Sequence, residues 1–106
     1  MSDRVPTATM AANAEKGLKL RERFGRGGTA VGVRRARQLA AREALGEADI
    51  KAMHSYFARH AVDKKAKAKR WGDESDPSAG YIAWLLWGGD EGAAWARARH
   101  DELKDG

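Results

Sequence analysis

Apolar side chains recur along this chain at spacings of three and four residues, the pattern that one buried face of an α-helix produces. Ile50, Met53 and Phe57 show this spacing clearly, with mostly polar or small residues between them. The pattern predicts an all-α fold of four to five short helices in one small domain. The segments that it favours are residues 12–24, 30–44, 47–61, a helix from Pro77 to Gly88 and a last helix from Asp90.

The densest apolar stretch runs from Pro77 to Trp95, PSAGYIAWLLWGGDEGAAW, and holds three of the four tryptophans. Between Tyr81 and Trp87 almost every position is apolar. An amphipathic surface helix would show a wide polar face, which is missing here. We therefore expect this helix to be buried on nearly all sides and to form the centre of the domain.

Residues with known preferences for helix ends mark the limits of this central helix. Asp76 is expected to be its N-cap, with Pro77 at the first helical position, where the missing N–H costs nothing. Gly88-Gly89 is expected to end it in a left-handed conformation, and Asp90 to cap the next helix. Because the turn is so short, the two helices are expected to form a Trp-rich C-terminal hairpin.

A glycine-rich segment, GRGGTAVG, separates the first two predicted helices. Glycines that open a helix can bind phosphate through backbone N–H groups. Here no strand precedes the glycines and no Gly-Lys-Ser/Thr follows, which excludes a P-loop. We interpret the segment as a helix end followed by an N-cap at Thr29, with a residual anion site at Arg26 as the alternative.

The predicted core collects the large apolar residues of these faces: Phe24, Leu39, Ile50, Met53, Phe57, Tyr81, Trp84, Leu85, Trp87 and Trp95. A chain of 106 residues can bury such a core as a single domain, and it does so here without any cysteine. We assign residues 12–104 to this helical domain. Residues 1–11 mix small and polar side chains without periodicity and are interpreted as an extended N-terminal arm.

The net charge of +5 is concentrated in the first half of the chain. Residues 1–53 hold eleven Lys and Arg against six Asp and Glu, whereas residues 54–106 hold nine of each. Such a surface favours a polyanion or an acidic protein face, and a merely solvated surface is the open alternative. The candidate contacts are Arg26, Arg34, Arg35, Arg37, Arg42, Lys64, Lys65, Lys67, Lys69 and Arg70.

The sequence offers little catalytic chemistry. His54 and His60 are six residues apart and face different sides of a helix, and no carboxylate stands at a spacing that completes a metal site with them. No nucleophile elbow is present either. We expect no catalytic residue, no metal, no cofactor and no small-molecule substrate.

No apolar run approaches the ~20 residues of a membrane span, and no signal pattern opens the chain. We therefore expect a soluble, intracellular protein without a membrane partner.

Three segments carry a resemblance to a known family: GRGGTAVGVRRARQLAAR at 25–42, MHSYFARHAVDKKA at 53–66 and PSAGYIAWLLWGGDEGAAWA at 77–96. The chain resembles small, largely uncharacterised helical proteins and domains encoded by bacteriophages, which occur beside or fused to phage head and other structural proteins. The resemblance covers about half of the chain. It brings no catalytic residues with it.

The resemblance implies a non-enzymatic structural or interaction protein. It would be a minor or decorating component of the virion, bound to capsid or connector subunits. Before assembly it would be located in the host cytoplasm. The alternative, from the charge alone, is a basic helical module that binds DNA mainly through phosphates. Base-specific recognition is not favoured, because the basic helix comes first, whereas the recognition helix of a helix-turn-helix is the second.

Overall fold

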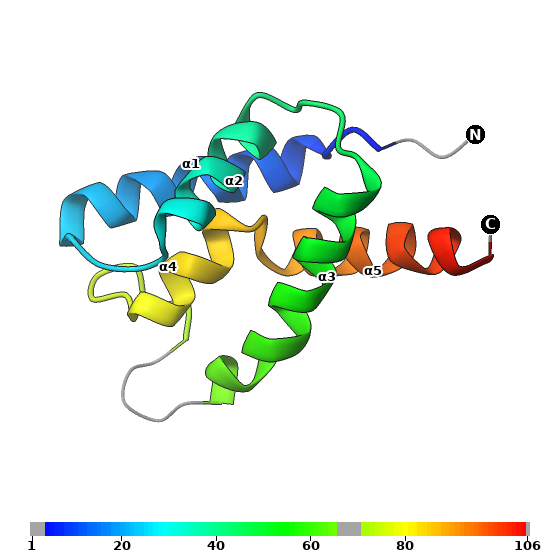
Figure 1. Ribbon diagram of the computed structural model, residues 1–106. Coiled ribbons are helices and arrows are strands. Elements are labelled where there is room, and N and C mark those ends of the chain that lie inside the picture. The colour runs from blue at the N-terminus through cyan, green and yellow to red at the C-terminus, as the bar shows by residue number, and fades with distance from the viewer. Residues whose placement is uncertain (1–3, 66–70, 106) are drawn as a thin grey trace.

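The computed structural model describes residues 4–65 and 71–105 of the chain (Figure 1). This part contains five α-helices, one short 3-10 helix and no strand, which confirms the predicted all-α fold. The elements are α1 (Ala8–Phe24), α2 (Ala30–Ala40), α3 (Glu47–His60), the 3-10 helix η1 (Ala61–Lys65), α4 (Ala79–Leu86) and α5 (Gly89–Asp105). None of the described helices is both long and apolar enough to cross a membrane.

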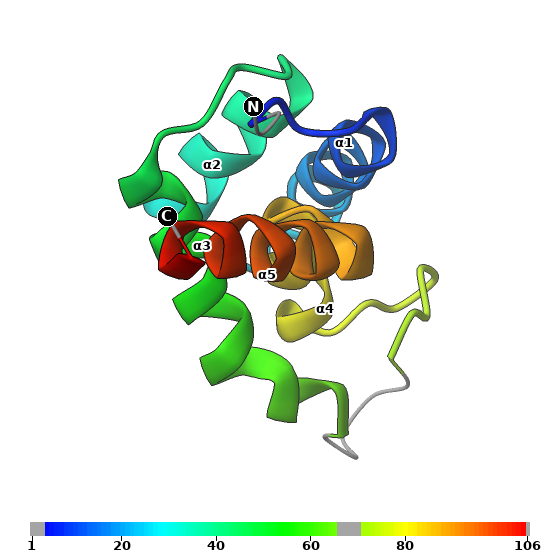
Figure 2. The ribbon, with the colours of Figure 1, turned by 90° about the vertical axis from the view of Figure 1, so that its right-hand side faces the viewer.

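The helix α4 lies at the centre of the molecule. Helices α1 and α2 pack on one side of it and α3 stands on the other (Figure 1). The helix α5 leads away from the end of α4 and crosses α3 (Figures 1 and 2). The turn predicted between α4 and α5 is therefore present, but the hairpin that it makes is open, since α5 packs on α3 more than on α4.

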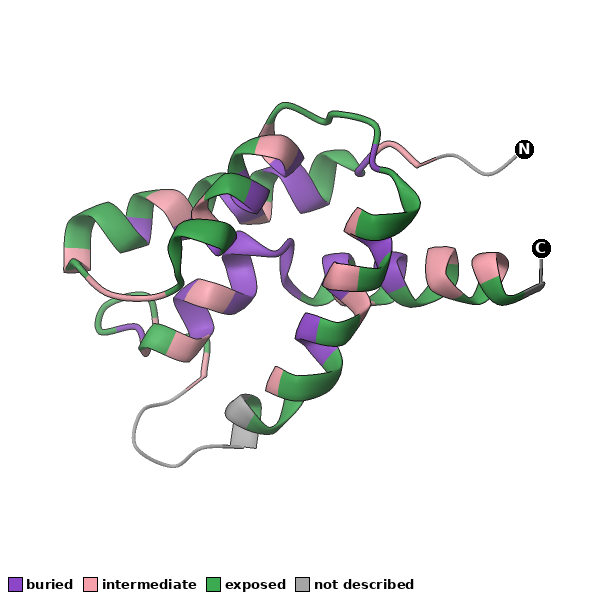
Figure 3. Ribbon diagram, in the orientation of Figure 1, coloured by how far each residue is buried: buried purple, intermediate pink, exposed green. Residues whose placement is uncertain are grey.

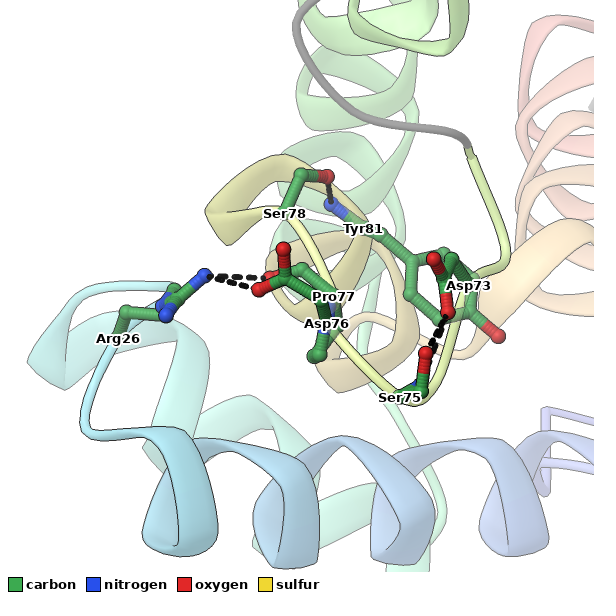
Figure 4. Close-up of polar contacts among 7 residues, drawn as sticks. All are labelled: Arg26, Asp73, Ser75, Asp76, Pro77, Ser78 and Tyr81. Carbon is green, nitrogen blue, oxygen red and sulfur yellow. Dashed lines mark hydrogen bonds and ion pairs between the residues drawn. The ribbon is translucent and has the colours of Figure 1, made fainter.

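Burial of α4 follows from its composition. Five of its eight residues are buried, and Figure 3 shows most of the helix and the turn after it in the colour of buried residues. Its N-cap is Ser78, whose hydroxyl accepts a hydrogen bond from the backbone nitrogen of Tyr81 at 3.0 Å. The predicted start at Asp76-Pro77 is wrong by two residues. Arg26 binds the Asp76 carboxylate at 3.3 Å and the carbonyl oxygen of Pro77 at 3.0 Å, so both act in the loop before the helix (Figure 4).

The glycine stop after α4 is confirmed. Gly88 and Gly89 have φ angles of +110° and +69°, which other residues rarely adopt. Asp90, however, is not the N-cap of α5, because the helix already begins at Gly89 and the carbonyl of Gly88 accepts the first bond, from Gly92 at 3.0 Å. The Asp90 carboxylate instead accepts the indole N–H of Trp84 at 2.9 Å.

The predicted boundary of the N-terminal arm at residue 11 is wrong. Helix α1 begins at Ala8, with the Thr7 hydroxyl accepting from the backbone nitrogen of Met10 at 3.1 Å. Pro6 and Met10 are fully buried, so this segment is part of the domain. Among the predicted arm residues that the structure describes, only 4–7 lie outside α1. Residues 1–3 of the predicted arm lie outside the described part.

The basic helix α2 ends earlier than predicted, at Ala40 instead of residue 44. Arg42 has a φ of +53°, which breaks the helix, and its side chain donates to the carbonyl oxygen of Pro6 at 2.8 Å. The segment before α1 and the segment after α2 are thereby tied together. The helix α3 ends at His60, one residue before the predicted limit, and continues as η1.

Most of the predicted core is buried. Phe24 alone is partly exposed, and the other nine residues of that set are among the buried ones. Trp95 belongs to the same buried cluster as Trp84 and Trp87. Several buried residues were not among the predicted ones, most clearly Met10, Tyr56, Ile82 and Leu86.

Gly17, in the middle of α1, marks the close approach of α1 to α4. A Cβ atom at this position would lie 2.9 Å from the backbone nitrogen of Leu86 and 3.0 Å from Cβ of Leu85. Real Cβ atoms essentially never come as close as the first distance, and the second is tighter than most real Cβ contacts. The helix therefore accepts a residue of poor helix propensity in order to bring α1 against α4.

Gly17→Ala should destabilise the protein even though alanine is the better helix former by about 1 kcal/mol. Overpacking of this kind costs about 1–3 kcal/mol and should outweigh the gain. Chemical denaturation followed by circular dichroism measures the difference. Ala12→Gly, at an exposed position of the same helix, is the control for propensity alone. A Gly17→Ala protein that is more stable than the parent would contradict the close contact.

Candidate functional site

A groove with a volume of about 620 Å³ opens between the start of α2, one face of α3 and the first turns of α4. Small residues line much of it: Ala52, Ala79, Gly80 and Ala83. Val31, at the start of α2, adds an apolar side chain that is 50% exposed. Pockets of a few hundred Å³ with mainly apolar walls are typical of binding sites.

Stacked aromatic rings form one wall of this groove. The ring of Tyr56 lies parallel to that of Trp87, with centroids 4.4 Å apart and an interplanar angle of 5°. On the same ring of Tyr56, the imidazole of His60 stacks at 4.5 Å. Tyr56 and Trp87 are each less than a tenth exposed. Their packing holds the wall in one conformation.

Arg35 supports this wall from within the protein. Its guanidinium lies 5.3 Å from the centroid of the Trp87 ring, close enough for a cation–π interaction. Asp49 accepts a hydrogen bond from it at 2.7 Å and Gln38 another at 2.8 Å. The hydrogen bond from Arg35 lowers the pKa of the Asp49 carboxyl from its ordinary value and outweighs the opposing effect of burial. The ion pair thus stays charged. It links Arg35 of α2 to Asp49 of α3 and holds the guanidinium against the Trp87 ring.

The groove carries one arginine, Arg59, whose guanidinium only donates hydrogen bonds. Arg59 and Ser55 are exposed on α3, and their side chains form no hydrogen bond or ion pair with any described residue. Arg59 and His60 are the basic residues of the described lining, and no carboxylate is among the described residues that line it. The groove therefore combines a fixed aromatic wall, small apolar side chains and a basic rim.

Of the ten predicted polyanion contacts, the structure describes the side chains of six. Four of them make contacts within the protein: Arg26 with Asp76, Arg35 with Asp49, Arg42 with Pro6 and Lys64 with Asp90. The expectation that Arg35 lies on the surface is wrong, because it is only 9% exposed. Arg34 and Arg37 are exposed on α2. Nothing is described of the Lys65 side chain, and Lys67, Lys69 and Arg70 lie outside the described residues.

Two further polar clusters lie outside the groove. Glu74 accepts hydrogen bonds from Lys16 at 3.0 Å and from the Tyr81 hydroxyl at 3.2 Å. Burial, together with the negative charge of Glu74, raises the pKa of Tyr81 to about 12. Asp90 binds Lys64 and Trp84, and the bond from Lys64 holds the pKa of Asp90 below its ordinary value. These residues tie the loop before α4, η1 and α5 to the core.

The histidines do not assemble a metal site among the described residues. His54 of α3 and His100 of α5 stack with ring centroids 3.9 Å apart and nearly parallel planes. No group of three or more potential ligands lies together in the part of the chain that the structure describes. The stack contributes to the crossing of α3 and α5.

The groove was not predicted from the sequence because many of its lining residues are small and because they come from three helices that are far apart in the sequence. One signal was available on α3: Ala52, Ser55 and Arg59 are spaced by three and four and lie beside the apolar face of Met53 and Phe57. The small side chains of Ala52 and Ser55 leave space beside that face, and Arg59 adds a charge one turn further along. Nothing in the sequence indicates that α2 and α4 form the other walls.

Compared with known proteins, the chain matches no family model, no curated protein and no solved structure. The geometry of the groove therefore carries the functional proposal.

Acidification should weaken the contact between α3 and α5. Burial lowers the pKa of His54 from its ordinary value of 6.5, and His100, Lys104 and Arg97 on α5 act in the same direction against the opposing charge of Asp101. A lowered pKa means that protonation is more costly in the folded state. Stability is thus complete above about pH 6.5 and falls as the pH drops below it.

Thermal melts at about pH 7.5 and about pH 5 measure this loss. His54→Gln should reduce the difference between the two melts. Both pH values lie above the pKa of Asp49 and of Asp90, which are lowered from 3.8. Protonation of these two carboxyl groups therefore does not contribute to the difference in stability. Equal melting temperatures at both pH values in the parent protein would contradict the assignment.

Proposed function

We propose that this protein is a non-enzymatic interaction module that binds a partner protein in the groove between α2, α3 and α4. The observation that carries the proposal is the fixed aromatic wall formed by Tyr56 and Trp87. This wall lines an open groove, and no other part of the described protein fills the space in front of it. Rigid aromatic side chains bind partners at a low cost in conformational entropy. They are also the residues that most often dominate the energy of protein interfaces.

The proposed setting is a bacteriophage particle, where the protein is a minor or decorating component bound to capsid or connector subunits. The support for this setting is the resemblance of the segments 25–42, 53–66 and 77–96 to phage-encoded helical proteins. All of the groove-lining residues except Ala52 fall within these three segments. A shared sequence pattern that coincides with the groove is what a shared docking surface would produce.

A basic module that binds DNA is the second candidate. Arg34 and Arg37 favour it, because both are exposed on α2 and form no ion pair with any described residue. Against it, four of the ten predicted contacts are engaged within the protein. A phosphate-binding surface would also give no role to the aromatic wall of the groove. The protein-binding proposal accounts for more of the structure.

The test is to measure how much of the protein enters virions of the phage that carries this gene. Ser55→Trp places an indole over the groove from an exposed position of α3. We expect quantitative mass spectrometry of purified particles to detect the parent protein and at least about tenfold less of this variant, as for loss of an interface hot spot.

Ala94→Trp is the matched control, since it adds the same side chain at an exposed position of α5 outside the groove. Melting curves of both variants establish that they fold. Particles that lack the parent protein would contradict the virion setting. Normal incorporation of Ser55→Trp would contradict the use of the groove.

A further inference from the structure

We infer that the occupant of the groove is a short, acidic, amphipathic helix of the partner protein. This inference rests on the proposed docking function and specifies the chemistry of the partner. It follows from three properties of the groove: the sign of its charge, the kind of anchor that its wall accepts, and the nature of the surrounding elements.

The polar groups of the groove call for an acceptor. Arg59 supplies a guanidinium with several donors, and Ser55 a hydroxyl one turn away on the same face of α3. The indole N–H of Trp87 likewise has no hydrogen-bond partner among the described residues. With no carboxylate among the described lining residues, a basic partner would meet like charge at Arg59 and find nothing to neutralise it. An Asp or Glu side chain satisfies these donors.

The apolar part of the groove has room for a large side chain of the partner. Ala52 on one wall and Ala79, Gly80 and Ala83 on the other fill little of the space in front of the Tyr56 and Trp87 rings. Val31 at the rim is half exposed and adds apolar contact. A Leu, Phe or Trp of the partner would pack against the rings. The occupant is therefore amphipathic, with apolar anchors toward the rings and carboxylates toward Arg59.

The backbone of the occupant must satisfy its own hydrogen bonds. An extended peptide usually does so by adding to the edge of a sheet, and the described part of the chain contains no strand. A helix carries its backbone hydrogen bonds internally. Small residues on α3 and α4 let a third helix approach closely, in the way that amphipathic helices bind to grooves. The groove geometry thus favours a helix.

The experiment is selection from a displayed library of randomised helical peptides of about four turns, or ~14 residues, against the full-length protein. Selected peptides are sorted by whether Ser55→Trp abolishes their binding and Ala94→Trp does not. We expect the groove-dependent peptides to be acidic, with apolar residues at spacings of three and four. For the strongest of them, Arg59→Glu should weaken binding about tenfold or more, as loss of a complementary charge does at an interface.

Arg37→Glu is the charge control, since Arg37 is exposed on α2 but does not line the groove. An equal loss with Arg37→Glu and Arg59→Glu would show a response to overall charge and overturn the inference. Groove-dependent peptides that are neutral or basic would overturn it while leaving the docking function standing. If no peptide depends on the groove, both fail. Displacement of the acidic peptide by a short DNA duplex, sensitive to Arg37→Glu, would assign the surface to nucleic acid instead.

Discussion

Burial of the short apolar helix α4 is the constraint on which the rest of the structure depends. A helix with almost no polar face is stable in water only if other elements cover it on nearly every side. Helix α1 covers one side and approaches so closely that position 17 has no room for a Cβ atom. The loop before α2 lies against Ile82 and Leu86 of α4, and the turn at Gly88 closes the end of the helix. The hydrophobic effect thus fixes these three segments around the eight residues of α4.

The helix α3 covers α4 less completely, and this incomplete cover creates the groove. Its apolar face contributes Met53 and Phe57 to the core, while its neighbouring face of small residues stands off from α4. Trp87, just after α4, bridges the gap by stacking on Tyr56. The buried Arg35 then holds Trp87 from behind, and Asp49 neutralises that charge. The same set of contacts that completes the core therefore also builds the wall of the proposed binding site.

The fold was largely predictable from the sequence because its signals are local. Periodic apolar residues such as Ile50, Met53 and Phe57 define a helix face, and Gly88-Gly89 can adopt the conformation that ends a helix. Cap positions were less predictable, since Asp76 and Ser78 both suit an N-cap and the choice depends on Arg26, fifty residues earlier in the chain. The groove was not predictable. The burial of Arg35 depends on Trp87 and Asp49, which only tertiary packing brings to it.

The central claim, that the groove is the binding surface, is tested most directly by amide chemical-shift mapping of the ¹⁵N-labelled protein with a selected acidic peptide. If the peptide binds in the groove, the shifts concentrate at Val31, Ala52, Ser55, Ala83 and the Trp87 indole, with little change at the exposed arginines of α2. Shifts that centre on Arg34 and Arg37, or that spread evenly over the basic surface, would contradict it.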